Sequence, residues 1–231
     1  MSFYLIQFLN GLVAASSLFL VAAGLSIIFG VTRIVNFAHG SFYMLGAYIA
    51  YSLIARAPSG GVGFWSGVAL SALIVGVLGV AIEMTILRRI YRAPELFQLL
   101  ATFGVVLIVE DATLWIWGSE DLLGPRAPGL RGAIAIMDRR LPEFDLLMIA
   151  LGPAVLAGLW ILFHRTRWGT LVRAATLDRE MVGALGVNQT WLFTSVFFVG
   201  AFLAGLGGAL RLPRDAANLH MDLNKIGRAH V

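Results

Sequence analysis

The amino-acid sequence predicts an all-α polytopic membrane protein, a bundle of about six membrane-spanning helices. Hydrophobic residues make up 59% of the 231 residues and charged residues only 13%, which leaves too little polar surface to cover a soluble globule. Several uncharged runs are long enough to cross a bilayer core of about 30 Å at about 1.5 Å per helical residue. Because these runs do not alternate in polarity, helices are favoured over the strands of a barrel.

The predicted spans follow one another along the chain. Residues 1–32, 34–55, 57–82 and 181–210 contain no Asp, Glu, Lys or Arg, and residues 96–117 and 146–163 are apolar enough to be added to them. The first run lacks a positively charged start and is longer than the apolar part of a signal peptide, so we predict an uncleaved span. The absence of cysteine excludes a disulfide framework.

Arginine residues predict the orientation, because positive charges in short loops are retained on the cytoplasmic side. One set of alternate loops holds most of them: Arg33, Arg88, Arg89, Arg92, Arg165, Arg167, Arg173 and Arg179. This side is therefore predicted to be cytoplasmic, which places the N-terminus and the Gly/Pro-rich loop 117–142 outside. The basic residues are spread from loop to loop and form no clustered face, so no nucleic-acid partner is expected.

Small residues recur at helical spacing within the predicted spans. The two stripes are Gly200, Ala204 and Gly208, and Gly63, Gly67 and Ser71. Small side chains let membrane helices approach closely, so we expect these stripes to serve packing within the bundle.

A polar island joins the first two spans and contains Arg33, Asn36, His39 and Gly40. Two interpretations stand equally. Either the island is an interfacial turn, in which Arg33 reaches to the membrane surface and His39 caps a broken helix, or it lines the path or gate of a transporter, because ionisable residues inside a membrane are candidates for function.

Glu110 and Asp111 interrupt the span at 96–117. The uncharged part before them covers only about 21 Å, so the helix is predicted to continue past them. A solvated boundary near the outer surface is the favoured interpretation, and a wet cavity in the path is the alternative.

The longest cytoplasmic loop carries the signals of a very short helix between residues 178 and 187. Asp178 can cap its N-terminus, Glu180 complements the helix dipole, and Gly186 can take the left-handed closing position. A helix of this length is not stable alone in water, so it must dock on the lipid surface or in a groove of a soluble partner. Met181, Val182 and Leu185 are the predicted apolar contacts.

The chain resembles the permease subunits of bacterial branched-chain amino acid ABC transporters, in particular the smaller of the two paired permeases. The resemblance covers nearly the whole chain and rests on residues 24–40, on Tyr43 to Tyr48, Tyr91-Arg92, Ala101 to Gly104, Trp168-Gly169, Arg173-Ala174 and the loop 178–187. The most specific piece is Asn36-Phe-Ala-His39-Gly40. Met181 and Val182 depart from the alanines usual in the family, which affects the shape of the docking surface.

This resemblance implies a subunit of an importer in the bacterial inner membrane, with a second permease, two cytoplasmic ATPase subunits and an extracytoplasmic solute-binding protein as partners. It implies that the segment Asp178 to Val187 is the coupling helix to the ATPase, and it leaves the solute open between branched-chain amino acids, urea, amides and aromatic acids. A complete chain would have about eight spans. We therefore expect residues 1–225 to form a truncated permease domain and residues 226–231 to be a non-native tail.

Catalytic signatures are missing from the sequence. It contains no phosphate-binding G-x-x-x-x-G-K-[ST] motif, and its histidines are too scattered for a metal site. The chain is therefore expected not to be an enzyme and to need no cofactor of its own, with ATP bound by partner subunits. Two rivals remain: an ion-coupled secondary transporter using Glu110 and Asp111, and a membrane hydrolase, which is disfavoured because Ser41 and His39 point to different sides of a helix.

Overall fold

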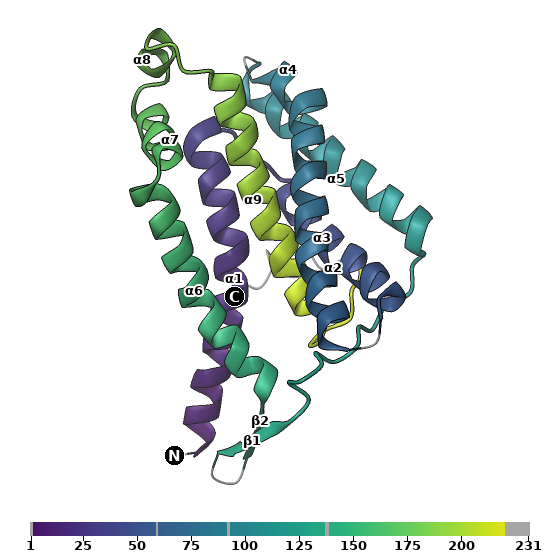
Figure 1. Cartoon of the computed structure of the whole chain (residues 1–231). Helices are drawn as coiled ribbons and strands as arrows, with labels where there is room; N and C mark the ends of the chain where they lie inside the picture. The colour runs from purple at the N-terminus through teal and green to yellow at the C-terminus, as the bar shows by residue number, and fades with distance from the viewer. Residues whose placement is uncertain (1, 59, 92, 137–138, 220–231) are drawn as a thin grey trace.

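The computed structural model describes residues 2–58, 60–91, 93–136 and 139–219, and the expected boundary at 225 and tail 226–231 lie outside this range (Figure 1). The described chain is largely helical. Its helices in chain order are α1 (Ser2–Thr32), α2 (His39–Arg56), α3 (Gly61–Ile82), the π-helical turn η1 (Glu83–Leu87), α4 (Arg88–Ile90), α5 (Glu95–Trp117), α6 (Glu143–Arg165), α7 (Arg167–Leu177), α8 (Arg179–Ala184) and α9 (Gln189–Arg211). The prediction of an all-α bundle is confirmed.

Five stretches of the described residues are long and apolar enough to cross a membrane. They are Tyr4–Thr32, Gly61–Ile90, Glu95–Trp117, Glu143–Arg165 and Gln189–Arg211. The predicted run at 181–210 is divided, because its first residues belong to α8 and only α9 spans. The predicted run at 57–82 extends further, since α3 continues through η1 and α4.

The sixth predicted span, residues 34–55, differs from expectation. Only its later part is helical, as α2, and α2 is not among the segments that qualify as spans by composition. Most of α2 is buried, including His39, Ser41 and three large aromatic side chains, Phe42, Tyr43 and Tyr48. This helix carries polar groups because the other helices surround it, and it has little surface to offer to lipid.

Helix α9 is the centre of the bundle and packs against α1, α2 and α3 (Figure 1). Gly46 of α2 meets the backbone of Gly205, and Gly208 meets the carbonyl of Tyr43, so a Cβ at either position would collide with main-chain atoms. Gly63 of α3 meets the carbonyl of Pro58, which follows α2, and Gly67 meets the side chain of Ile54 in α2. The prediction that the small-residue stripes serve packing is confirmed, because bare backbone lets these helices approach closely.

After Trp117, which ends α5, the described part of the loop 117–142 has no helix, as predicted, but it contains a β-hairpin that sequence reasoning did not anticipate. Strands β1 (Ala133–Ile136) and β2 (Arg139–Pro142) pair antiparallel, with Ile134 opposite Leu141. The loop is also tied to the segment after α9, because Leu122 and Ala217 exchange two backbone hydrogen bonds of 2.9 Å. In Figure 1 the hairpin and α8 lie at opposite ends of the bundle.

Candidate functional site

The short helix predicted between residues 178 and 187 is present as α8, at the tip of a helical turn that joins α7 to α9 (Figure 1). Asp178 Oδ1 accepts a hydrogen bond of 2.9 Å from the Met181 amide, which confirms the predicted N-terminal cap. Gly186 has φ 82°, which confirms the predicted left-handed closing residue. Glu180 lies in the first turn, as expected. The sequence therefore predicted both ends of this helix correctly.

The apolar residues of α8 divide between two faces, and this corrects the prediction for Val182. Val182 is only 4% exposed and packs inside the chain against residues of α1, α7 and α9, so it is not available to a partner. Met181 and Leu185 are 58% and 75% exposed, and the neighbouring Leu177 is 85% exposed. We call Leu177, Met181 and Leu185 the α8 tip. Single exposed apolar residues are common, but three on one short turn form a surface that a partner can cover.

Two contacts fix α8 to α9, and a third ties the end of α1 to α7. The Gln189 side-chain amide donates a hydrogen bond of 2.8 Å to the Arg179 carbonyl, and the Arg179 guanidinium lies 4.0 Å from the centre of the Phe193 ring. Burial lowers the pKa of Arg179, and the nearby positive charge of Arg33 lowers it further. Arg33 in turn donates a 3.3 Å hydrogen bond to the Thr176 carbonyl of α7. Helix α8 is therefore held directly by α9, while the adjoining α7 is held by the residue that follows α1.

A buried ionic network lies beside α8, and sequence reasoning did not identify it. Glu83, which is fully buried, receives two hydrogen bonds from Arg88, of 2.9 and 3.3 Å. Tyr91 and Thr194 each donate a further hydrogen bond of 3.0 Å to the same carboxylate, and Arg88 also donates one of 2.7 Å to the Thr194 hydroxyl. The only hint in the sequence is a glutamate that ends an apolar run with an arginine five residues later.

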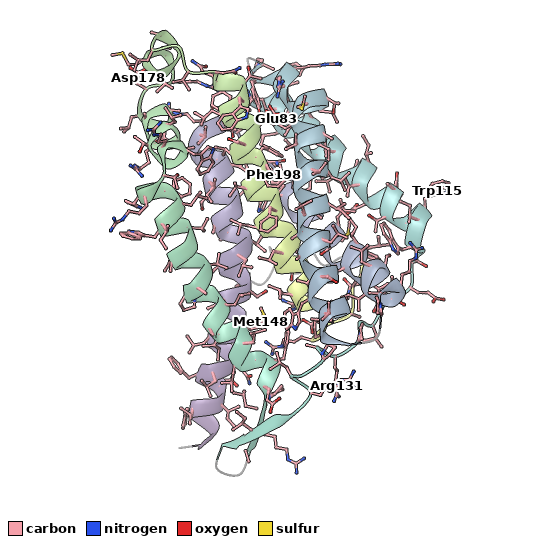
Figure 2. The ribbon with its side chains drawn as sticks, viewed as in Figure 1. Glu83, Trp115, Arg131, Met148, Asp178 and Phe198 are labelled. Atoms are coloured by element: carbon pink, nitrogen blue, oxygen red, sulfur yellow. The ribbon has the colours of Figure 1, made fainter. Side chains whose placement is uncertain are left out.

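The Glu83 network joins η1, which continues α3, to α9 through the Thr194 hydroxyl. The backbone of η1 is wound more loosely than an α-helix. Burial raises the pKa of the Tyr91 phenol, and the Glu83 carboxylate raises it further, so Tyr91 remains a hydrogen-bond donor. A groove of about 610 Å³ separates this network from α8. Its lining is Glu83, Arg88, Arg89, Tyr91, Arg179, Glu180, Gln189, Thr190 and Phe193. Figure 2 shows Glu83 and Asp178 at the same end of the bundle.

The polar island between α1 and α2 is split by the structure. Arg33 ends α1 with φ 57°, is exposed, and contacts α7. The next residues have no helical structure, and Asn36, 3% exposed, accepts a 3.1 Å hydrogen bond from the Ala38 amide through its side chain. Arg33 therefore fits the interfacial interpretation, while Asn36 is turned into the bundle.

His39 lies deep in the bundle. It begins α2, is 2% exposed, and its Nε2 lies 2.9 Å from the Val21 carbonyl of α1. Val21 is about 16 Å back along α1 from Thr32, at about 1.5 Å per residue. The chain therefore turns back into the bundle after α1, and α2 starts well inside it with Gly40 in its first turn. His39 does not cap the helix, because the cap position belongs to Ala38.

Glu110 and Asp111 lie on α5, which continues to Trp117 as predicted. Glu110 is partly buried and Asp111 is exposed. They lie about 22 Å along the helix from Glu95, whereas α5 faces the bundle with Val105, Val109 and Thr113. The structure does not bring these two carboxylates into the α8 region or the Glu83 network.

The class of protein follows from these features. Five apolar stretches of spanning length, a buried helix among them that carries polar side chains, and a capped helical turn protruding at one end define a polytopic helical membrane protein.

Comparison with known proteins identifies the family. Residues 7–219 match the family model described as "Branched-chain amino acid transport system / permease component", and the chain belongs to this family. It is therefore the permease component of an ABC transport system, a multi-pass membrane protein whose family is not a class of enzymes.

Curated relatives agree with the family match. The chain is 27% identical over 215 residues to the high-affinity branched-chain amino acid transport system permease protein BraD of Pseudomonas aeruginosa. It is 26% identical over 216 residues to LivH, the corresponding permease of Escherichia coli, and 25% identical over 216 residues to LivH of Salmonella typhimurium. Each alignment covers 90% of this chain and 70% of the relative. No solved structure matches the chain.

Proposed function

We propose that this chain imports branched-chain amino acids across a cell inner membrane, as the smaller of two permeases. Its partners in this proposal are the second permease, two cytoplasmic ATPase subunits that bind ATP, and an extracytoplasmic solute-binding protein. The names of the relatives, all high-affinity branched-chain amino acid permeases, support the substrate class. The alternation of arginines between the loops supports an N-terminus outside and α8 in the cytoplasm.

The observation that carries the proposal is the construction of α8. A helix of six residues is far too short to be stable alone in water, yet α8 is capped by Asp178, closed by Gly186 and fixed to α9. The α8 tip is exposed, whereas Val182 on the other face of α8 is buried inside the chain. We assign the α8 tip, with Asp178 and Glu180 at its rim, as the contact with the ATPase subunit.

In this mechanism, closure of the ATPase subunits on ATP displaces α8, and the displacement reaches α9 through the Arg179–Phe193 stack and the Gln189 hydrogen bond. Because α9 is the centre of the bundle, its movement would also move α2, which packs against it. Arg33, Asn36, His39 and Gly40 are our candidates for the gate, since they connect the α8 region to the buried start of α2. Glu110 and Asp111 are secondary candidates for the path.

A variant that reverses the charge of Glu180 and places a charge at Leu185 tests the coupling role. The chain is co-expressed with its ATPase subunit, and the variant Glu180→Lys with Leu185→Asp is expected to lose the ATPase on affinity purification, because a buried charge at the contact is not compensated. The matched control is Leu123→Asp, which alters a leucine that is 79% exposed in the loop at the opposite end. Retention of the ATPase by the double variant at the level of the control would refute the assignment.

Energy coupling and orientation are tested with the same preparation. Uptake of leucine into liposomes that requires ATP and the binding protein supports the proposal, whereas uptake driven by an ion gradient without ATPase subunits would establish the secondary-transporter alternative. The chain contains no cysteine, so single substitutions Glu120→Cys and Leu185→Cys report the two sides. A membrane-impermeant thiol reagent is expected to label only Glu120→Cys in intact cells, and the reverse pattern would invert the orientation.

A further inference from the structure

A second cavity lies at the end of the bundle opposite α8, and neither the proposed coupling nor the proposed gate uses it. It has a volume of about 240 Å³ and is bounded by α1, α6, the end of α9 and the turn that follows α9. Met148 marks its place in Figure 2, where α6 crosses α1 far from Asp178. In the proposed orientation this cavity opens toward the outside, where an importer receives its solute.

Both signs of charge meet in this cavity. Arg211 at the end of α9 and Asp215 in the following turn form an ion pair with a nitrogen–oxygen distance of 2.5 Å, and their side chains are 30% and 49% exposed. Backbone hydrogen bonds fix their spacing, because the Asp215 amide donates to the Arg211 carbonyl at 3.1 Å. The exchange of hydrogen bonds between Leu122 and Ala217 holds the same turn from the other side. The two charges are therefore held in place and remain reachable.

Neutral hydrogen-bonding groups lie next to the guanidinium. Ser17 of α1 lines the cavity and is 5% exposed. The Tyr43 hydroxyl from α2 lies close to both Ser17 and Arg211. Asn10 adds a side-chain amide about two helical turns before Ser17, on the same face of α1. A carboxylate bound at Arg211 would thus have hydroxyl donors at hand as well as a positive charge.

Arg214, which pairs with Asp145 at 3.4 Å, also lines the cavity, and the rest of its wall is apolar. Val13, Met148 and Leu210 line the cavity and are almost completely buried, so they form a firm apolar surface beside the charges. Sugars are usually held by many polar groups and ring faces, and a small neutral amide would have no use for a paired positive and negative charge. A zwitterion with an aliphatic side chain fits both the charged and the apolar part of this lining. Its carboxylate, its ammonium and its hydrocarbon side chain each have a counterpart there.

We propose that this cavity is an acceptor site for an aliphatic amino acid, which binds its carboxylate at Arg211, its ammonium at Asp215 and its side chain against Val13, Met148 and Leu210. The inference rests on the proposed import of branched-chain amino acids and adds a site within the permease itself. Such a site would take the solute from the binding protein before the bundle changes conformation. The binding protein would then release the solute at the same outer surface on which the permease captures it.

The test measures equilibrium binding of radiolabelled L-leucine to the purified permease–ATPase complex, without binding protein and without nucleotide. We expect saturable binding that unlabelled leucine displaces. Leucinamide and isoamylamine, which lack the carboxylate, are expected to compete at least about tenfold more weakly, and so is 4-methylpentanoate, which lacks the ammonium. Arg211→Gln and Asp215→Asn are each expected to weaken leucine binding by about tenfold or more. This competition pattern in the unaltered protein does not depend on whether a variant folds.

A steric variant with a matched control completes the test. Ala14→Trp places a large side chain in the cavity from an exposed position on α1, and Leu18→Trp makes the same kind of change at an exposed leucine outside the lining. Loss of leucine binding in the first and its retention in the second are expected. If the complex imports leucine with its binding protein but shows no saturable binding, or binds leucinamide equally well, the cavity is only a surface ion pair and the inference fails. If no branched-chain amino acid is imported at all, the proposed function fails instead.

Discussion

Removing Arg88 should destabilise the protein more than removing the charge of its partner, Glu83. Glu83 is fully buried, whereas the Arg88 side chain is 33% exposed. In Arg88→Met the carboxylate would keep only the hydroxyl donors of Tyr91 and Thr194. Breaking a buried pair from one side costs about 3–5 kcal/mol, and the two remaining hydrogen bonds place this case near about 3 kcal/mol.

The opposite substitution leaves the less costly charge behind. In Glu83→Gln the Arg88 guanidinium can turn toward water, and a glutamine side chain can still accept from Tyr91, so we expect a loss of about 1–2 kcal/mol. The double variant removes both charges and should also cost about 1–2 kcal/mol. Its cost would therefore fall about 2–4 kcal/mol below the sum of the single changes, which defines the coupling between the two side chains.

Thermal unfolding in detergent, followed by tryptophan fluorescence, measures these differences. At about 2–4 °C per kcal/mol for a chain of this size, Arg88→Met should lower the midpoint by about 6–12 °C and Glu83→Gln by about 2–8 °C. Arg89→Met is the control, because Arg89 is the exposed neighbour in the same helix. Additive effects of the two single variants, or a larger loss in Glu83→Gln than in Arg88→Met, would refute the assignment of the buried charge to Glu83.

Three further predictions use other contacts. Gly46→Ala should lower the unfolding midpoint by the equivalent of about 1–3 kcal/mol, because the new Cβ meets the α9 backbone. The control Gly104→Ala has open space around the new Cβ and should leave the midpoint unchanged. Equal midpoints for the two variants would contradict the close packing of α2 on α9. Asp178→Ala should lose about 1 kcal/mol of local stability, measured as faster amide exchange in α8, and unchanged exchange would show that the cap is dispensable. Trp117→Phe should cost about 1 kcal/mol by losing its 2.6 Å hydrogen bond to Ser52, and an unaltered midpoint would count against that bond.

Local signals were sufficient for the elements that obey them. Long apolar runs predicted α1, α3, α5, α6 and α9, because crossing a bilayer requires apolar length above all. The ends of α8 could be predicted because helix capping involves residues that are close in sequence. The Asp178 carboxylate and the Gly186 backbone act on groups only a few residues away. Such interactions leave their mark within a short window of sequence.

Interactions between distant segments were not readable. The Glu83 network needs Thr194 from another helix, and the face on which Val182 lies depends on α1, α7 and α9 together. The buried start of α2 was also hidden, because a run such as 34–55 indicates apolar length and not depth. The cavity at the end of the bundle opposite α8 combines residues of α1, α6 and the end of α9, and no single segment among them carries a binding motif.

The buried position of α2 imposes an order on the biosynthesis of this protein. Because α2 is enclosed mainly by α3 and α9, and α9 is the last of these to leave the ribosome, α2 cannot reach its final environment when it is first made. Until α9 is made, α2 therefore lacks the helix against which it packs most extensively. Nascent chains stalled before α9 should therefore leave a cysteine placed at Tyr48 open to a thiol reagent, and chains stalled after α9 should protect it. Protection at both lengths would show that α2 settles without α9.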